Sequence, residues 1–172
     1  LAGGVALAMR EDGRSLDETE AQIRATLPDA HLLLIPRTLE NLVKNGRAPK
    51  LAGQLTQMLN IRLAVSPEWK SGEIKAIKKG RGAKRIVVNT MADCLAFLAE
   101  HPGSSVRVLT TGAAEEQELV SQALAGQDYV DAGTGPIGCT IATHVDIDAI
   151  AITLLPPLPA NSLGTPTSVA VE

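Results

Sequence analysis

The sequence predicts a mixed α/β fold, with one sheet flanked by helices. Short apolar or β-branched segments alternate along the 172 residues with longer segments of helical periodicity. Two weakly alternating segments, 61–66 and 72–78, are joined by PEWKS, which is typical of a β-hairpin. Strands that alternate with helices build a layered sheet, and a hairpin adds an antiparallel pair to it. We therefore expect a mixed sheet with flanking helices.

In the first half of the chain, the sequence predicts four helices and, ahead of the hairpin, one buried strand. The opening LAGGVALAM indicates an apolar, Ala-rich helix. Ser15 and Glu18 form a capping box that predicts a helix over 16–27, ended by Pro28. HLLLIP (31–36) predicts a buried strand, and helices are expected over 38–45, ended by Asn45-Gly46, and 50–59. Trp69 is expected at the hairpin tip.

The second half continues the same alternation. A helix is expected over 83–100, although Ile86 to Val88 favour a strand locally, and His101-Pro102-Gly103 ends it. Strands are predicted at 105–110, 127–132 and 149–155, and Thr111 is expected to open a helix with acids in its first turn. Residues 139–144 indicate one or two helical turns. The tail 156–172 carries four of the ten prolines and is expected to be an extended arm.

Composition excludes several classes of protein. Hydrophobic residues make up 45% of the chain, enough for a core, but Trp69, Phe97 and Tyr129 are the only aromatic ones. Two cysteines, Cys94 and Cys139, do not make a disulfide framework, and no secretory segment is present, so a cytoplasmic location is expected. The longest apolar runs fall short of the roughly 20 residues that a membrane span needs, so no span is expected.

Charge is distributed unevenly along the chain. Residues 1–86 hold 15 Lys or Arg against 9 Asp or Glu, a charge of +6, whereas residues 87–172 hold 1 against 10, a charge of −9. The densest basic stretch is KAIKKGRGAKR (75–85), which suits phosphate, an acidic partner or plain solvent. Nucleic acid is not expected as a partner, because the chain lacks aromatic stacking platforms and its acidic half repels phosphate.

The stretch GTGPIGCTIATHVDIDAIAI (133–152) allows three interpretations. Gly133, Gly135 and Gly138 match the dinucleotide pattern G-x-G-x-x-G, but the crossover helix and the later acidic residue of that motif are missing. His144, Asp146 and Asp148 would share one face of a strand and could ligate a metal for a metal-assisted hydrolase. On a helix the three would scatter, and the same residues then indicate a turn beside a satisfied histidine.

The third interpretation is a slot for a long-chain carboxylate. Ile137, Ile141 and Val145 give an apolar stripe on the short helix, while Thr140, Thr143 and His144 supply donors beside it. An apolar slot that ends in hydrogen-bond donors suits an acyl tail and its carboxylate head. Cys139 and His144 lack a visible orienting acid, so a thiol enzyme is not expected.

Four segments in this order resemble the DegV family of bacterial fatty-acid-binding proteins across 1–155: LENLVKNGR, QLTQMLNIRLAV, SGEIKAIKKGRGAKR and GPIGCTIATHVDIDAIAI. The resemblance implies the C-terminal lobe of a two-lobe α/β fold, with the N-terminal lobe absent from this chain. It also implies a carrier rather than an enzyme, with one long-chain fatty acid held in a tunnel between the lobes and presented to a fatty acid kinase catalytic subunit. No other cofactor and no metal are expected.

By position, His144 resembles the family histidine beside the carboxylate, with Thr143 next to it, and Arg81 resembles the arginine near the tunnel mouth. Arg47 matches the arginine that ends a helix, with a structural role. A carrier of this kind would gain from cations around the tunnel mouth when it docks on the kinase, and Lys78, Lys79, Lys84 and Arg85 of the basic segment qualify by charge.

Two departures from the family pattern alter these expectations. Asp146-Ile147-Asp148 stands where the family has Gly-Pro-Gly, which places two negative charges beside a carboxylate site. These charges would weaken head-group binding or hold His144 protonated. The resemblance also puts further head-group ligands in the N-terminal lobe. A scaffold lobe that has lost its ligand is therefore the remaining alternative.

Overall fold

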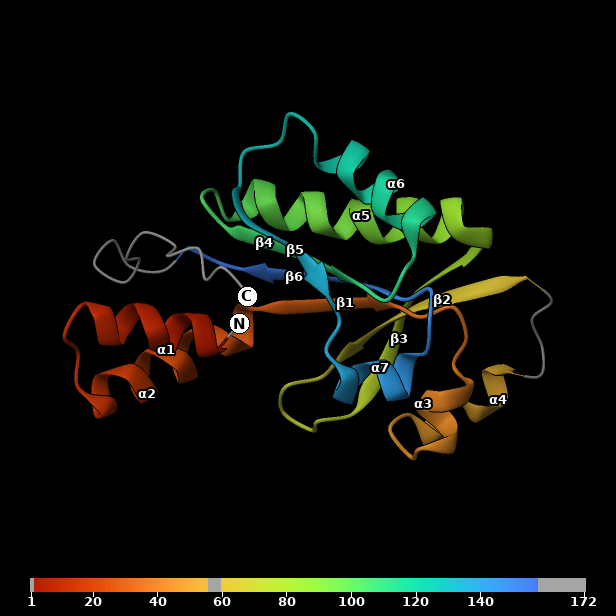
Figure 1. The fold of residues 1–172 in the computed structure, drawn as a ribbon, viewed down its shortest axis with the longest axis horizontal. Coiled ribbons are helices and arrows are strands. Elements are labelled where there is room, and N and C mark those ends of the chain that lie inside the picture. The colour runs from red at the N-terminus through yellow and green to blue at the C-terminus, as the bar shows by residue number, and fades with distance from the viewer. Residues whose placement is uncertain (1, 56–59, 158–172) are drawn as a thin grey trace.

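A six-stranded mixed sheet organises the chain in the computed structural model, which describes residues 2–55 and 60–157. The strand order is β3-β2-β1-β6-β4-β5. The predicted mixed α/β fold is confirmed (Figure 1). The strands are β1 (His31–Ile35), β2 (Ile61–Pro67), β3 (Ile74–Arg81), β4 (Ser105–Thr110), β5 (Val130–Pro136) and β6 (Ile150–Leu155). The helices are α1 (Ala2–Glu11), α2 (Leu16–Thr26), α3 (Glu40–Lys44), α4 (Ala52–Leu55), α5 (Gly82–Glu100), α6 (Ala114–Leu124) and α7 (Cys139–Val145), with 3-10 turns η1 (Leu27–Asp29) and η2 (Pro49–Leu51).

The sheet is mixed because one strand pair differs from the others. β4 and β5 run parallel and are connected through α6, whereas the other neighbouring strands pair antiparallel. At the centre, β1 pairs with β6 along its whole length, from His31 opposite Leu154 to Ile35 opposite Ile150. The first and last described strands therefore form the middle of the sheet.

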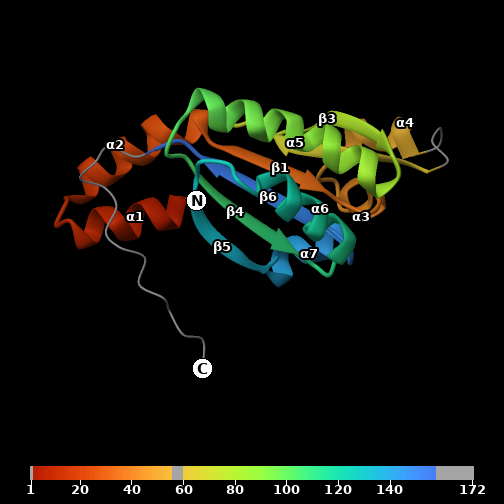
Figure 2. The same cartoon turned by 90° about the horizontal axis from the view of Figure 1, so that it is seen from above.

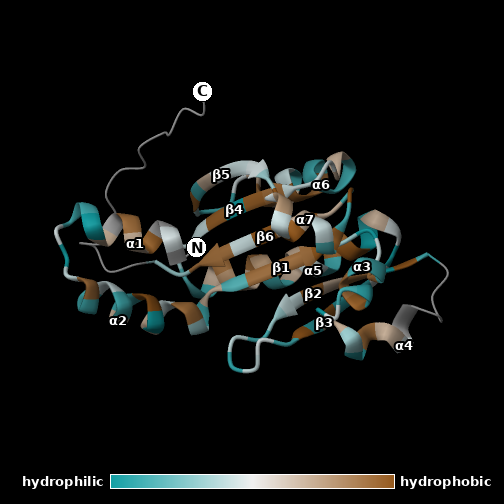
Figure 3. Cartoon of the chain, turned by 60° about the horizontal axis from the view of Figure 1, so that its bottom comes forward, coloured by the Kyte–Doolittle hydropathy of each residue, from teal (hydrophilic) through white to brown (hydrophobic). Residues whose placement is uncertain are grey.

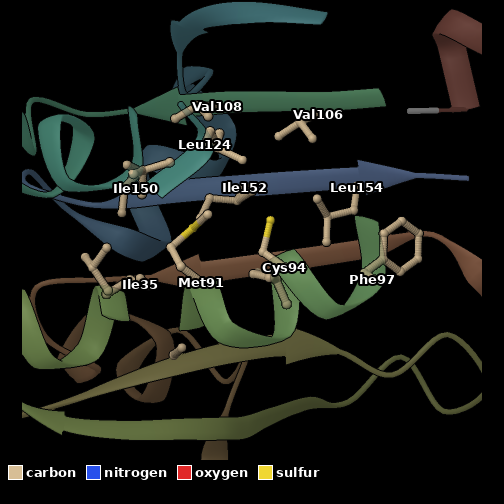
Figure 4. Packing of buried hydrophobic residues seen from close by; sticks show 14 of the residues in the cluster. Ile35, Met91, Cys94, Phe97, Val106, Val108, Leu124, Ile150, Ile152 and Leu154 are labelled. Atoms are coloured by element: carbon tan, nitrogen blue, oxygen red, sulfur yellow. The ribbon is translucent and has the colours of Figure 1, made fainter. Parts of the chain in front are cut away.

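Each face of the sheet supports its own apolar core. Alternate side chains of β1 and β6, including Leu33, Ile35 and Ile152, meet α5 and α6 in the larger core (Figure 4). The intervening side chains, including Leu34 and Ala151, pack on the opposite face with residues of α3, η2 and α7. The two faces are covered unequally, since α5 spans one of them while only short helices cover the other (Figures 1 and 2).

Helices α1 and α2 form an antiparallel hairpin that projects from one end of the sheet (Figure 2). The predicted capping box is confirmed at α2, where Ser15 Oγ accepts from Glu18 N at 3.3 Å and Glu18 Oε2 accepts from Ser15 N at 2.9 Å. The hydrogen bonds that the Ser15 amide and the Ser15 hydroxyl donate to Oε2 lower the pKa of the Glu18 carboxyl. A small core that includes Val5, Met9 and Leu155 joins the hairpin to the sheet. Hydrophilic and hydrophobic residues alternate along α2 (Figure 3).

The predicted β2–β3 hairpin is confirmed, and its tip folds back on the sheet. Trp69 lies in the connecting loop, and its Nε1 donates to the carbonyl of Ala30 at 2.8 Å. That carbonyl directly precedes β1, so the indole anchors the tip to the strand next to its own hairpin. The Trp69 ring remains 45% exposed.

Three predicted boundaries were wrong. The strand expected at 127–132 lies at 130–136. The carboxylate of Asp131 accepts a hydrogen bond from Gly133 N, and Gly133 has a φ of 84°. Glycine adopts this backbone conformation readily, and the Gly-rich segment stays paired with β4. α6 begins at Ala114 rather than at Thr111, whose hydroxyl instead binds the carbonyl of Asp146 and the amide of Ala149. The helix expected over 50–59 is a 3-10 turn followed by α4 as far as residue 55, and 56–59 lie outside the described residues.

Residues 158–172, which make up most of the predicted extended arm, lie outside the described residues. Within the described part, no helix is both long and apolar enough to cross a membrane.

The two cysteines are expected to differ sharply in reactivity. Cys94 is fully buried in the larger core and burial raises the pKa of its thiol to about 12, whereas Cys139 is exposed at the start of α7. Because the thiolate is the nucleophile, a thiol-reactive disulfide reagent at pH 8 should modify one cysteine quickly in the folded chain and both in denaturant. Cys139→Ser should remove the fast reaction. Two fast thiols in the folded wild type would contradict the buried position of Cys94.

Candidate ligand-binding site on helix α7

Helix α7 lies at the end of the sheet where β1, β4 and β5 finish and β6 begins. It connects β5 to β6 and packs beside α3, which follows β1 (Figure 1). Val145, near its C-terminus, is buried in the second core together with Ile137 from the preceding loop. Four of the five predicted ligand-binding residues, Thr140, Ile141, Thr143 and His144, are thus held on one short, anchored helix.

The predicted apolar stripe on α7 needs correction. Ile137 and Val145 are buried, but Ile141 is 51% exposed. The buried side of α7 is the row of Ala142 and Val145, three residues apart, rather than the row that contains Ile141. Thr140 and Thr143 are exposed, and the Thr143 hydroxyl donates to the carbonyl of Thr140 at 2.8 Å.

His144 is half-buried at the end of α7 and has a defined partner. Asn45, at the C-terminus of α3, lies with its Nδ2 3.2 Å from the imidazole Nδ1 and donates to the carbonyl of Thr143 at 3.2 Å. Nε2 of His144 has no hydrogen-bond partner within residues 2–55 and 60–157. Sequence reasoning used Asn45 only as a helix stop and missed this contact. One sequence signal could have indicated this contact, because Asn41 and Asn45 are four residues apart and share a face of α3.

The two aspartates after α7 are engaged by other residues. Asp146 accepts from Asn41 Nδ2 at 3.2 Å and from the amide of Ile147 at 2.8 Å. Asp148 forms an ion pair with Arg37, with Nη1 and Oδ2 2.6 Å apart. Both aspartates have positive φ, 65° and 56°, which is uncommon outside glycine. The turn between α7 and β6 is therefore fastened to α3 and to the segment before it.

The metal interpretation is not supported by this arrangement. His144 ends a helix and Asp146 and Asp148 lie in a turn, so the strand spacing that would align the three does not exist. Among the described residues, no group of three or more His, Cys, Asp or Glu side chains could hold a metal ion. The dinucleotide interpretation fails for a related reason, because Gly133 and Gly135 lie inside β5 rather than in a loop after it.

The basic segment lies on the opposite edge of the sheet. Arg81 ends β3 and precedes α5, and both β2 and β1 separate β3 from β6. At about 4.8 Å per strand, this separation is on the order of 14 Å, so the structure does not bring Arg81 to His144. Lys78 is paired with Asp93 on α5 at 2.9 Å. The other predicted docking residues, Lys79, Lys84 and Arg85, are exposed.

A hollow of about 640 Å³ opens at the same end of the sheet as α7. Its lining includes the ion pair of Arg37 with Asp148 and the ion pair of Arg62 with Glu116. None of the predicted ligand-binding residues lines it. Arg37, Arg62 and Glu116 were missed by sequence reasoning, because their pairings span 111 and 54 residues and leave no local signal.

The family model described as "Uncharacterised protein, DegV family" matches residues 4–157. The chain belongs to the DegV family. A DegV domain-containing protein from Clostridium acetobutylicum is 27% identical over 149 residues, which cover 86% of this chain and 51% of that protein. One from Streptococcus pyogenes is 29% identical over 147 residues and is covered to 52%. The chain therefore spans about half the length of the curated DegV relatives it matches.

Solved DegV structures share the fold. One, a DegV family protein from Thermus thermophilus described as binding fatty acid, superposes with a TM-score of 0.77 at 22% identity, covering 88% of this chain and 54% of that one. The fatty acid kinase (Fak) B3 protein of Streptococcus pneumoniae, loaded with linoleic acid, gives a TM-score of 0.70 at 22% identity, covering 87% and 52%. At this identity the likeness establishes the fold of this DegV chain.

Proposed function

We propose that this chain forms part of a fatty-acid carrier and receives the carboxylate head on α7. The observation that carries the proposal is Nε2 of His144 on α7, which is accessible and has no hydrogen-bond partner among the residues that the structure describes. Thr143 and Thr140 lie beside it as hydroxyl donors, and exposed Ile141 offers apolar surface. Two DegV proteins of the same fold are described as binding fatty acid or as loaded with linoleic acid, which supports this class of ligand.

Asp146 and Asp148 repel a bound carboxylate less strongly than two free charges would. Asp148 is paired with Arg37, and Asp146 accepts hydrogen bonds from two amide groups. Hydrogen bonds and an opposite charge stabilise carboxylates locally and reduce their repulsion of a nearby anion. In the proposal, the chain supplies the lobe of 1–155, and the tunnel is completed by a second lobe, since this chain spans only about half of its relatives.

The proposed test is native mass spectrometry of the protein that contains this chain. We expect one co-purifying long-chain fatty acid, and His144→Ala should lower fatty-acid affinity at least about tenfold, because a hydrogen bond to a charged group contributes about 1.5–3 kcal/mol. His101→Ala is the matched control, since His101 lies at the C-terminus of α5 near the opposite end of the sheet. Absence of any fatty acid from a folded protein would favour the ligand-free scaffold.

We also propose that the carrier is a binding partner rather than an enzyme, and that it docks on a fatty acid kinase catalytic subunit in the cytoplasm. Two free cysteines support a reducing compartment. Exposed Lys79, Lys84 and Arg85 would steer an acidic partner, whereas Lys78 is already paired with Asp93.

Charge reversal separates docking from lipid binding. Replacing Lys79, Lys84 and Arg85 with glutamate should weaken docking on the kinase subunit at least about tenfold at low salt, with a smaller effect at high salt. The measurement is surface plasmon resonance at two salt concentrations. Fatty-acid content should not change. Glutamate at Lys50 is the control, because that lysine is paired with Glu73 on a different part of the surface. Unchanged docking would contradict the role of this segment.

A further inference from the structure

Helix α3 contacts the last turn of α7 through two asparagines. Asn41 and Asn45 are four residues apart and point their amide groups at neighbouring atoms of α7 and the turn after it. Asn41 Nδ2 donates to Asp146 Oδ2, while Asn45 Nδ2 faces both the carbonyl of Thr143 and the ring of His144. The contacts bridge residues 98 to 105 positions apart in sequence.

The carbonyl of Thr143 determines which way the Asn45 amide points. A carbonyl oxygen only accepts hydrogen bonds, so the amide nitrogen must face it, and the reverse orientation would place two oxygens 3.2 Å apart. The same nitrogen is 3.2 Å from Nδ1 of His144. Its two hydrogens can therefore be donated to the carbonyl oxygen of Thr143 and to Nδ1 of His144 at the same time.

We infer that Asn45 is a positioning residue that selects, in the neutral ring of His144, the tautomer with its proton on Nε2. Because Asn45 Nδ2 is a donor, Nδ1 of the ring must accept, and the one ring proton then lies on the far nitrogen. Among the described residues, only Arg62 Nε is a buried side-chain nitrogen without a partner, so Nε2 of His144 is accessible from outside. Asn45 thereby presents an N–H donor outward from α7.

This assignment deepens the proposed function and names the atom that would donate to the fatty-acid carboxylate. The carboxylates of Asp146 and Asp148 contact Asn41, Ile147 and Arg37, and Nδ1 of His144 contacts an amide donor rather than an acid. A donor that is fixed before the ligand arrives loses less freedom on binding.

The tautomer can be read directly by NMR. Two-bond nitrogen–proton correlation spectra of the ¹⁵N-labelled chain at about pH 8, above the ordinary histidine range near 6.5, distinguish the two neutral forms. We expect the Nε2–H pattern for His144, assigned by its loss in His144→Ala. Asn45→Asp should move the proton to Nδ1, because a carboxylate can only accept. Asn45→Ala should leave a mixture of the two tautomers.

Asn41→Ala is the matched control, since it removes an amide from the same helix but leaves the ring contact intact. Its spectrum should keep the Nε2–H pattern. The inference is overturned by an Nδ1–H pattern or an even mixture in the wild type, or by an Asn45→Ala spectrum identical to it. Apart from the His144→Ala variant that assigns the signal, reading the wild-type tautomer needs no variant. The spectrum is recorded without lipid. If the protein failed to bind fatty acid while His144 showed the Nε2–H pattern, only the proposed function would be rejected.

Discussion

Replacing Glu116 with glutamine is expected to lower the free energy of unfolding by about 3 kcal/mol, because it leaves the guanidinium of Arg62 charged and nearly buried without its counter-ion. The two side chains are only 13% and 8% exposed. Arg62 Nη2 also donates to the carbonyl of Pro36 at 3.4 Å, while its Nε is buried without a partner among the described residues. The neutral amide cannot replace the ion pair. Urea denaturation measures the loss.

The control is the neighbouring Glu115, which is exposed in the same turn of α6. Glu115→Gln should change stability by no more than about 0.5 kcal/mol. Replacing Arg62 and Glu116 together, with methionine and leucine, should recover most of the loss, because no uncompensated charge then remains buried. A Glu116→Gln variant within 1 kcal/mol of wild type would mean that water reaches and solvates Arg62.

Alanine at Gly80 is expected to destabilise the fold by about 3 kcal/mol, because the new Cβ has no room beside the backbone of α5. Gly80 is buried near the end of β3, and a Cβ there would lie 2.5 Å from Ile86 N and 2.7 Å from Ile86 Cα. These are main-chain atoms inside a helix, so no rotamer change can relieve the overlap. The strand and helix must separate, and thermal unfolding should show a clearly lower Tm.

Gly3→Ala provides the opposite case on the same assay. Gly3 lies in α1 with no atom within 4 Å of an added Cβ, and alanine lowers the entropy of the unfolded chain. We expect this variant to gain up to about 1 kcal/mol. If Gly80→Ala unfolded at the wild-type temperature, the close packing of β3 on α5 would be wrong.

Features with a local chemical cause were predictable from the sequence. The Ser15–Glu18 capping box involves residues three apart, and the β2–β3 hairpin and α5 follow from periodicity and turn residues. The strand preference of Ile86 and Val87 yielded to helix α5, where both side chains are buried in the larger core. The resemblance of four ordered segments to DegV proteins identified the family.

The parts that sequence reasoning missed depend on contacts between distant residues. Asn45 was read as a helix stop, which it is, but its contact with His144 spans 99 residues. Thr111 was taken for a helix start, yet its hydroxyl fastens the turn before β6. Arg81 and His144 were grouped by family position, although two strands separate their elements within this chain. Polar side chains have several possible partners, and only the tertiary fold selects one.

The pairing of β1 with β6 has a consequence for biosynthesis. Leu33 lies opposite Ile152, so the central ladder joins segments from nearly opposite ends of the described chain. A ribosome must release almost all of these residues before the two strands can meet, and until then the edge of β1 that faces β6 lacks its partner strand. Such late, long-range closure slows folding and leaves the nascent chain dependent on protection from aggregation.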